Sequence, residues 1–268
     1  MISWCSRAAA CAGIAALLVG AAPLRAQTVV APNALSGKAG EVDDALPLLG
    51  GATRFQQVYD NGQFASLTAP EYITQIAFRP FAADTKFTAN LPQITIRLST
   101  TSANSTSLSP TFASNITGAQ TLVYSDAPTI TSKVTPLSDG TTAFDIVLPL
   151  QTPFLYDPSK GSLLLDVTNA TGTDPNQAQG NALDATTSGD IGVARVFGNP
   201  GDATGTVDRG SSSSGNDAGV VTQFTFSRTI ATVPEAGTAF LFTLILAPAA
   251  GVLARRRTGG RTTKGHTK

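Results

Sequence analysis

The heptapeptide QITIRLS, residues 93–99, decides the fold class, because apolar and polar side chains alternate along it. Ile94, Ile96 and Leu98 fall on one face of an extended chain, and polar groups fall on the other. Alternation with a period of two predicts a strand that is buried on one side. The pattern returns in three further segments, whose inward residues are Phe144, Ile146 and Leu148; Leu163, Leu165 and Val167; and Val220, Phe224 and Phe226.

Further strand candidates and turn signals extend this pattern along the chain. Two tripeptides, Asp60-Asn61-Gly62 and Ser138-Asp139-Gly140, are typical of hairpin turns, since Asn and Gly accept positive φ. No helical periodicity appears between residues 50 and 230. About eight to ten short strands predict an all-β domain over residues 51–232, a single β-sandwich of jelly-roll type. The additional strand candidates are residues 53–59, 72–79, 121–125, 128–134 and 191–197.

Three segments lack a clear period. Residues 27–50 are expected to form a weakly ordered leader ahead of the sandwich. Residues 169–190 and 198–219 are long inserts rich in Gly, Asn, Asp and Ser. Such inserts in a compact domain are either functional or disordered, and we expect disorder here.

Charge is unevenly distributed along the 268 residues, although basic and acidic side chains are equal at 18 each. Two basic residues lie in 1–26 and six in 255–268, which leaves 10 basic groups against 17 acidic ones in 27–233. An acidic central region has no electrostatic footprint for nucleic acid. The composition therefore excludes nucleic acid as a partner.

The residue types that carry most covalent and metal chemistry are confined to the two ends. Met1, Trp4, Cys5 and Cys11 lie within the first 26 residues, and the single histidine is His266. Residues 27–233 therefore exclude Ser-His and Cys-His nucleophiles, thiol redox chemistry and metal sites with His or Cys ligands. Paired carboxylates, a Ser-Lys pair and a calcium site with oxygen ligands stay open.

The N-terminus has the three parts of a secretory signal peptide. Arg7 supplies the positive charge, residues 8–22 form an apolar run, and Ala26 is a small residue at the expected cleavage position. We expect export through the Sec translocon and cleavage by signal peptidase between Ala26 and Gln27. A buried N-terminal helix is the alternative.

The C-terminus has the pattern of a membrane anchor. Residues 237–254 contain no charge and are just long enough to cross a bilayer as a helix. Arg255, Arg256 and Arg257 follow directly, so the positive-inside rule places the basic tail 258–268 in the cytoplasm. The acidic central region is then expected outside the cytoplasm.

Val233, Pro234 and Glu235 stand immediately before this apolar segment, with Ala236 next. The Pro-Glu motif, the short apolar segment and the arginine cluster together resemble the PEP-CTERM sorting signal of Gram-negative bacteria. The resemblance covers residues 233–257 and implies processing by an exosortase-like membrane protease. It also implies delivery to the cell surface or the extracellular matrix.

The body of the chain carries a second resemblance. The segments ITQIAFRP, ITIRLSTTSA, FDIVLPLQTPFLYDPSKGSLLLDV and GVVTQFTF, which span much of 73–226, resemble a recurrent ectodomain found ahead of PEP-CTERM signals. This resemblance implies a class and a location, and it assigns no catalytic residue.

Carboxylates and tyrosines are the remaining candidates for a site. Asp145 and Asp166, on the polar faces of predicted strands, could act together on a glycosidic bond, and Glu41 and Glu71 are the only glutamates of the central region. A calcium site in the inserts is weakly indicated, since Asp also serves as a turn former; its ligands would come from Asp174, Asp184, Asp190, Asp202, Asp208 and Asp217. Tyrosines can stack on sugars, and the four candidates are Tyr59, Tyr72, Tyr124 and Tyr156.

These patterns together predict a non-enzymatic surface or matrix protein without a cofactor, associated with exopolysaccharide or adhesive. Two alternatives stay open. The first is a permanently anchored single-pass envelope protein. The second is a polysaccharide hydrolase that uses carboxylates.

Overall fold

The computed structural model describes residues 26–174, 180–210 and 219–229. Strands dominate these ranges, and the helices in them are short 3-10 turns: η1 (Asn33–Leu35), η2 (Asn61–Phe64), η3 (Phe112–Asn115) and η4 (Pro158–Lys160). The predicted all-β class is therefore confirmed. No helix in these ranges has the length and apolar character needed to cross a membrane. The predicted signal peptide, sorting motif and apolar segment lie outside the described residues, apart from Ala26 and Gln27 at the expected cleavage position.

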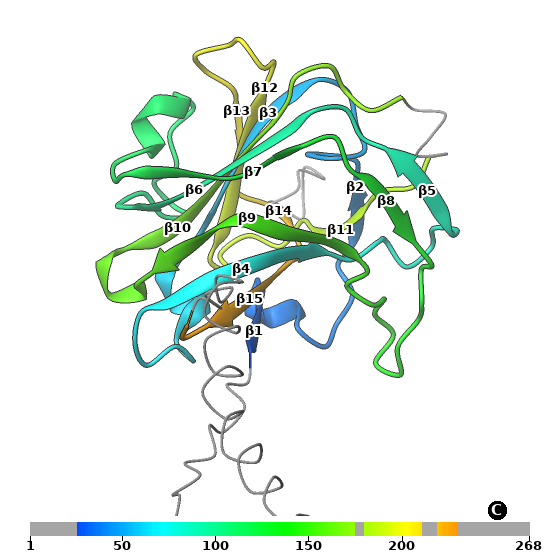
Figure 1. Ribbon diagram of the computed structural model, residues 1–268, viewed down its shortest axis with the longest axis horizontal. Coiled ribbons are helices and arrows are strands. Elements are labelled where there is room, and N and C mark those ends of the chain that lie inside the picture. Colours follow the sequence, from blue (N-terminus) through cyan, green and yellow to red (C-terminus); the bar gives the residue numbers. More distant parts are fainter. Residues whose placement is uncertain (1–25, 175–179, 211–218, 230–268) are drawn as a thin grey trace, which may run out of the picture. The chain divides into compact units, whose positions relative to one another are not determined.

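Two antiparallel sheets make up most of the described domain and face each other in a sandwich-like arrangement (Figure 1). The four-stranded sheet has the order β1 (Gln27–Ala31), β15 (Thr222–Ser227), β4 (Glu71–Phe78) and β9 (Ile146–Tyr156). The six-stranded sheet has the order β13 (Thr206–Asp208), β12 (Val193–Gly198), β3 (Thr53–Tyr59), β10 (Ser162–Asn169), β6 (Ile94–Thr101) and β7 (Gln120–Asp126).

Two small sheets complete the described strands. One joins β14 (Gly219–Val220), β11 (Leu183–Thr186) and β2 (Val42–Asp44), and the other pairs β5 (Phe87–Asn90) with β8 (Thr129–Ser132).

The core lies between the two main sheets, where the alternation places the apolar side chains. The predicted inward residues of β6, β10 and β15 are all buried. Across the core the rings of Tyr59 and Phe224 meet edge to face at 5.0 Å, and the Tyr59 hydroxyl bonds the Thr222 hydroxyl at 2.7 Å. Phe144 differs from the prediction, since it precedes β9 and is only half buried.

Strand β10 is buried on both faces, so its polar face does not meet solvent. Leu164 and Asp166 are buried as well as the inward residues, because a second apolar cluster covers the outside of the six-stranded sheet. Phe112 and Leu108, from the segment between β6 and β7, cap that cluster over Val58 and Leu164. The prediction that this strand is buried on one side only is therefore wrong.

The expectation of a weakly ordered leader over 27–50 is also wrong. Residues 27–31 form β1, which pairs with β15 from Gln27↔Phe226 to Ala31↔Thr222, and β2 pairs with β11. Val29 and Ala31 are buried in the core. These strands are too short to show a period in the sequence, and they are fixed by distant partners.

The two inserts contain strands where the sequence predicted disorder. Residues 183–186 form β11 and residues 206–208 form β13, each paired with an earlier strand. All four side chains of β11 are buried, so its sequence cannot alternate. The middle parts of both inserts, residues 175–179 and 211–218, lie outside the described residues.

The two turn signals have different outcomes. Ser138-Asp139-Gly140 makes a tight turn as predicted, with Gly140 at φ 84° and the bridge Pro136↔Thr142 beneath it. Asn61 and Gly62 instead begin η2, and the flanking strands β3 and β4 lie in different sheets. The predicted hairpin at this position is wrong.

Phe224→Ala is expected to lower the free energy of unfolding by about 3–5 kcal/mol, because it leaves a cavity against Tyr59 and Phe64 between the sheets. Urea denaturation followed by circular dichroism measures the change. Thr225→Ala, on the next and outward-facing position, is the control and should change stability by less than about 0.5 kcal/mol. Equal losses in the two variants would contradict this account of the core.

Candidate functional site

Asp166 is part of a buried polar cluster on the outer side of the six-stranded sheet. Its carboxylate oxygen Oδ2 accepts bonds from Arg54 at 2.9 Å, Gln56 at 2.9 Å and Gln120 at 3.1 Å. The Arg54 guanidinium stacks over the Phe112 ring, 4.7 Å from its centroid. The carboxylate of β10 therefore bonds side chains of β3 and β7 and so connects the three strands. Its surroundings are those of a structural ion pair.

Asp145, the other candidate acid, has different surroundings. It directly precedes β9, and its Oδ2 accepts a bond from the Lys133 backbone amide at 2.8 Å. The Lys133 amide does not bond Asp166, and the partners of Asp166 do not bond Asp145. No hydrogen-bonded group therefore links the two carboxylates into an acid–base pair.

The two glutamates are also engaged by neighbours. Glu71 is buried and accepts a bond from Arg228 at 3.0 Å. Partial burial opposes ionisation of Glu41, but the hydrogen bonds from Thr186 and Thr187 outweigh it and lower the pKa of this carboxyl below its ordinary value. Each glutamate thus holds a segment in place: Glu71 fixes the end of β15, and Glu41 fixes the residues after β11.

Several aspartates of the inserts bond to neighbouring side chains. Asp184 pairs with Arg79, Asp208 pairs with Arg195 at 3.5 Å, and Asp202 accepts a bond from Asn199 at 2.8 Å. Asp190 has a left-handed backbone at φ 57°, as in a turn. Across the described ranges no three Asp, Glu, His or Cys side chains gather where one metal ion could bind. Asp217 lies outside those ranges.

The Arg79–Asp184 pair is the most deeply buried ion pair of the described structure, and sequence analysis missed it. The two side chains are 1% and 2% exposed and meet at 2.6 Å. Arg79 also donates to the Lys38 carbonyl at 2.6 Å, while the Gly40 amide donates to Asp184 at 3.0 Å. The pair therefore ties the residues before β2 to the end of β4 and to β11.

Three of the four candidate tyrosines belong to the core rather than to a binding surface. Tyr59 and Tyr156 are fully buried, and Tyr124 is 6% exposed. Burial raises the pKa of Tyr59 and of Tyr156 well above the ordinary value. The Tyr156 hydroxyl donates to the Gly161 carbonyl at 2.9 Å. Of the four, only Tyr72 points outward.

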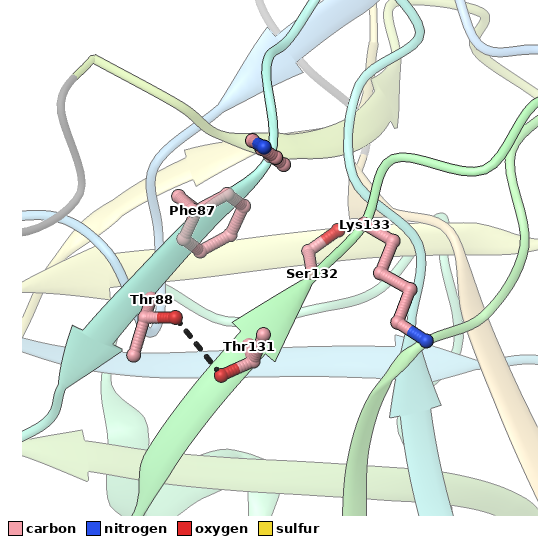
Figure 2. Close-up of a pocket in the computed structure, with 6 residues that line it drawn as sticks. Phe87, Thr88, Thr131, Ser132 and Lys133 are labelled. Carbon is pink, nitrogen blue, oxygen red and sulfur yellow. Dashed lines mark hydrogen bonds between the residues drawn. The ribbon is translucent and has the colours of Figure 1, made fainter.

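A shallow groove of about 350 Å³ lies along the β5–β8 pair (Figure 2). Lys86 and Lys133 line one end of it, next to the paired residues Phe87 and Ser132. The Thr88 and Thr131 hydroxyls bond each other at 3.0 Å, and the Lys133 side chain extends away from this pair (Figure 2). The lysines could attract an anion, but the polar groups of the groove do not converge on one point.

The outer side of the four-stranded sheet offers a broader surface, which we name the open sheet face. The register of β1, β15, β4 and β9 places on it the residues that alternate with the core. None of these side chains is charged, and Val147 and Leu155 are 39% and 51% exposed. The open sheet face comprises the exposed and half-buried residues of this set: Thr28, Val30, Tyr72, Gln75, Val147, Pro149, Leu155, Gln223, Thr225 and Ser227. Ala77 has the same register but is fully buried.

Asp184→Ala is expected to lower the free energy of unfolding by about 3–5 kcal/mol, because it leaves the Arg79 charge buried without its carboxylate. Thermal or urea denaturation gives the value. Asp202→Ala, at an exposed position of the other insert, should stay within about 0.5 kcal/mol of the native chain. A small effect of Asp184→Ala would mean that the ion pair does not hold the fold.

The folded domain is expected to lose stability as the pH rises above about 10, the ordinary pKa of tyrosine. In the unfolded chain the tyrosines ionise there, whereas burial keeps Tyr59 and Tyr156 protonated. The loss should approach about 1.4 kcal/mol per pH unit for each buried tyrosine. Urea midpoints between pH 9 and 11 measure the slope. Tyr59→Phe should reduce it, and an unchanged slope would contradict the assignment.

The comparisons with known proteins add no relative to this description. No protein-family model matches the chain, and neither the curated proteins nor the solved structures show a significant similarity to it. The inference of function therefore depends on the terminal sequence signals and on the geometry of the described domain.

Proposed function

We propose that the chain is an exported, non-enzymatic surface or matrix protein that is sorted by a PEP-CTERM and exosortase-type system. One observation carries the proposal: the folded domain fits between the two predicted signals. Strand β1 begins at Gln27, the residue after the expected signal-peptide cleavage. Strand β15 ends at Ser227, six residues before Val233 of the sorting motif. Removal of both signals would leave every described strand intact.

The route implied by this arrangement uses three partners. The Sec translocon exports the chain, signal peptidase cleaves it after Ala26, and an exosortase-like membrane protease acts near residues 233–236. The protein passes through the inner membrane of a Gram-negative bacterium and ends at the cell surface or in the extracellular matrix. Gln27 pairs with Phe226, so the first described strand begins and the last one ends at the same end of the four-stranded sheet.

The non-enzymatic role is supported by what the carboxylates contact. Asp166 is buried and is bonded to Arg54, Gln56 and Gln120, an arrangement that favours a structural role. A general acid needs a carboxyl that exchanges its proton with substrate. We therefore place an adhesive or structural role, with exopolysaccharide as the contact, ahead of hydrolysis.

The connectivity favours a jelly-roll-like sandwich as the finer description of the fold. Six successive pairs of main-sheet strands lie in opposite main sheets: β1 and β3, β3 and β4, β4 and β6, β7 and β9, β9 and β10, and β13 and β15. Strand pairs within both main sheets are antiparallel. Frequent crossing between two antiparallel sheets is typical of this class.

The intact mass of the native protein, taken separately from membranes and from the medium, tests the proposal. We expect an extracellular species that starts at Gln27 and ends near residues 233–236. A Pro234→Ala and Glu235→Ala double variant should accumulate in the membrane with its C-terminus at Lys268. If the native chain itself reaches Lys268 and occurs only in the membrane, sorting is wrong and the permanent anchor is right.

A further inference from the structure

We propose that the open sheet face binds an uncharged polysaccharide chain. This inference rests on the proposed function, because it names what the exported domain contacts. The face is defined above by the outward residues of β1, β15, β4 and β9.

The charge pattern points to an uncharged partner. Residues 27–233 carry 17 acidic and 10 basic side chains, yet the register of the described strands places none of them on the open sheet face. The outer side of the six-stranded sheet is different, since Arg97 and Asp166 lie opposite each other there and Arg54 bonds Asp166. That side is also partly covered by the segment with Phe112. Of the outer sides of the two main sheets, the open sheet face is thus the one without charged side chains.

The chemistry of the face matches a sugar chain. Tyr72 lies between Ser227 and Leu155 in the strand register, and Gln75 lies between Thr225 and Pro149. Hydroxyl and amide groups can exchange hydrogen bonds with sugar hydroxyls, while tyrosine and aliphatic side chains can pack on the apolar faces of sugar rings. At about 3.3 Å per residue, the accessible stretch of β4 from Tyr72 to Gln75 is about 10 Å long, enough for more than one sugar ring.

Other occupants fit the face less well. An acidic polysaccharide would meet a domain of net negative charge with no basic group on this face. A second copy that extends the sheet at β9 would meet Pro149 and Pro153, which lack amide donors. In addition, the Gln151 side chain bonds the Ser125 amide at 3.0 Å and so joins β9 to β7.

The test uses the full-length protein in detergent and the extracellular polysaccharide of the producing cells, separated by anion exchange into neutral and acidic fractions. Affinity electrophoresis should show retardation of the protein by the neutral fraction. Tyr72→Ala and Thr225→Lys should each weaken this retardation about tenfold, equivalent to about 1.4 kcal/mol. Thr131→Lys makes the same change on an exposed strand residue of the β5–β8 groove and should leave binding unchanged.

The urea midpoint of each variant shows whether it is folded, and Tyr72→Phe, which keeps the ring, should retain most of the binding. Three outcomes overturn the inference: no retardation by the neutral fraction, equal retardation by both fractions, or loss of binding in Thr131→Lys but not in Thr225→Lys. A dimer that Thr225→Lys dissociates would instead assign the face to a second copy. None of these results depends on C-terminal processing, so failure here is distinct from failure of the sorting proposal.

Discussion

The buried pair of Arg79 and Asp184 is the constraint on which the arrangement of the described domain depends. It connects three segments far apart in the sequence: the residues before β2, the end of β4 and strand β11. A buried ion pair adds little net stability compared with an apolar pair, but loss of one partner is costly. The role of the pair is therefore to fix the positions of these three segments relative to one another. Through it, Lys38 and Gly40 are held next to Asp184 of β11 at the end of β4.

The sequence predicted most of the longer strands and missed most of the short ones. β3, β4, β6, β7, β8, β10, β12 and β15 fall on predicted segments, as does the start of β9. β5 alternates between buried and exposed side chains, but it has only four residues and was missed. β11 is buried on both faces, and β1, β2 and β13 are short, so tertiary pairing alone defines them. The Asn61-Gly62 signal correctly marked a reversal but could not indicate which sheet the chain enters next.

The candidate site was less predictable than the fold. Alternation placed Asp166 outward, but only the path of the segment after β6 reveals that this side is covered. The bulge in β4 between Ile73 and Gln75 places Ile76 and Phe78 on the core side. Arg79 is buried by its contacts with Lys38 and Asp184, which alternation along β4 does not reveal. The outward residues of β15 could be identified as polar in the sequence. That these residues form one uncharged face together with residues of β1, β4 and β9 could be seen only from the register of the four strands.

The position of β15 has a consequence for how the protein reaches its folded state during synthesis. This last described strand lies inside the four-stranded sheet, between β1 and β4, and carries Phe224 and Phe226 into the core. A chain that is made from its N-terminus cannot complete that sheet until residue 227 has been added. Until then, the sheet has two unpaired strand edges and its core stays open. Chaperones have their longest access to the domain during this interval, and a chain arrested before residue 227 would be a substrate for proteases.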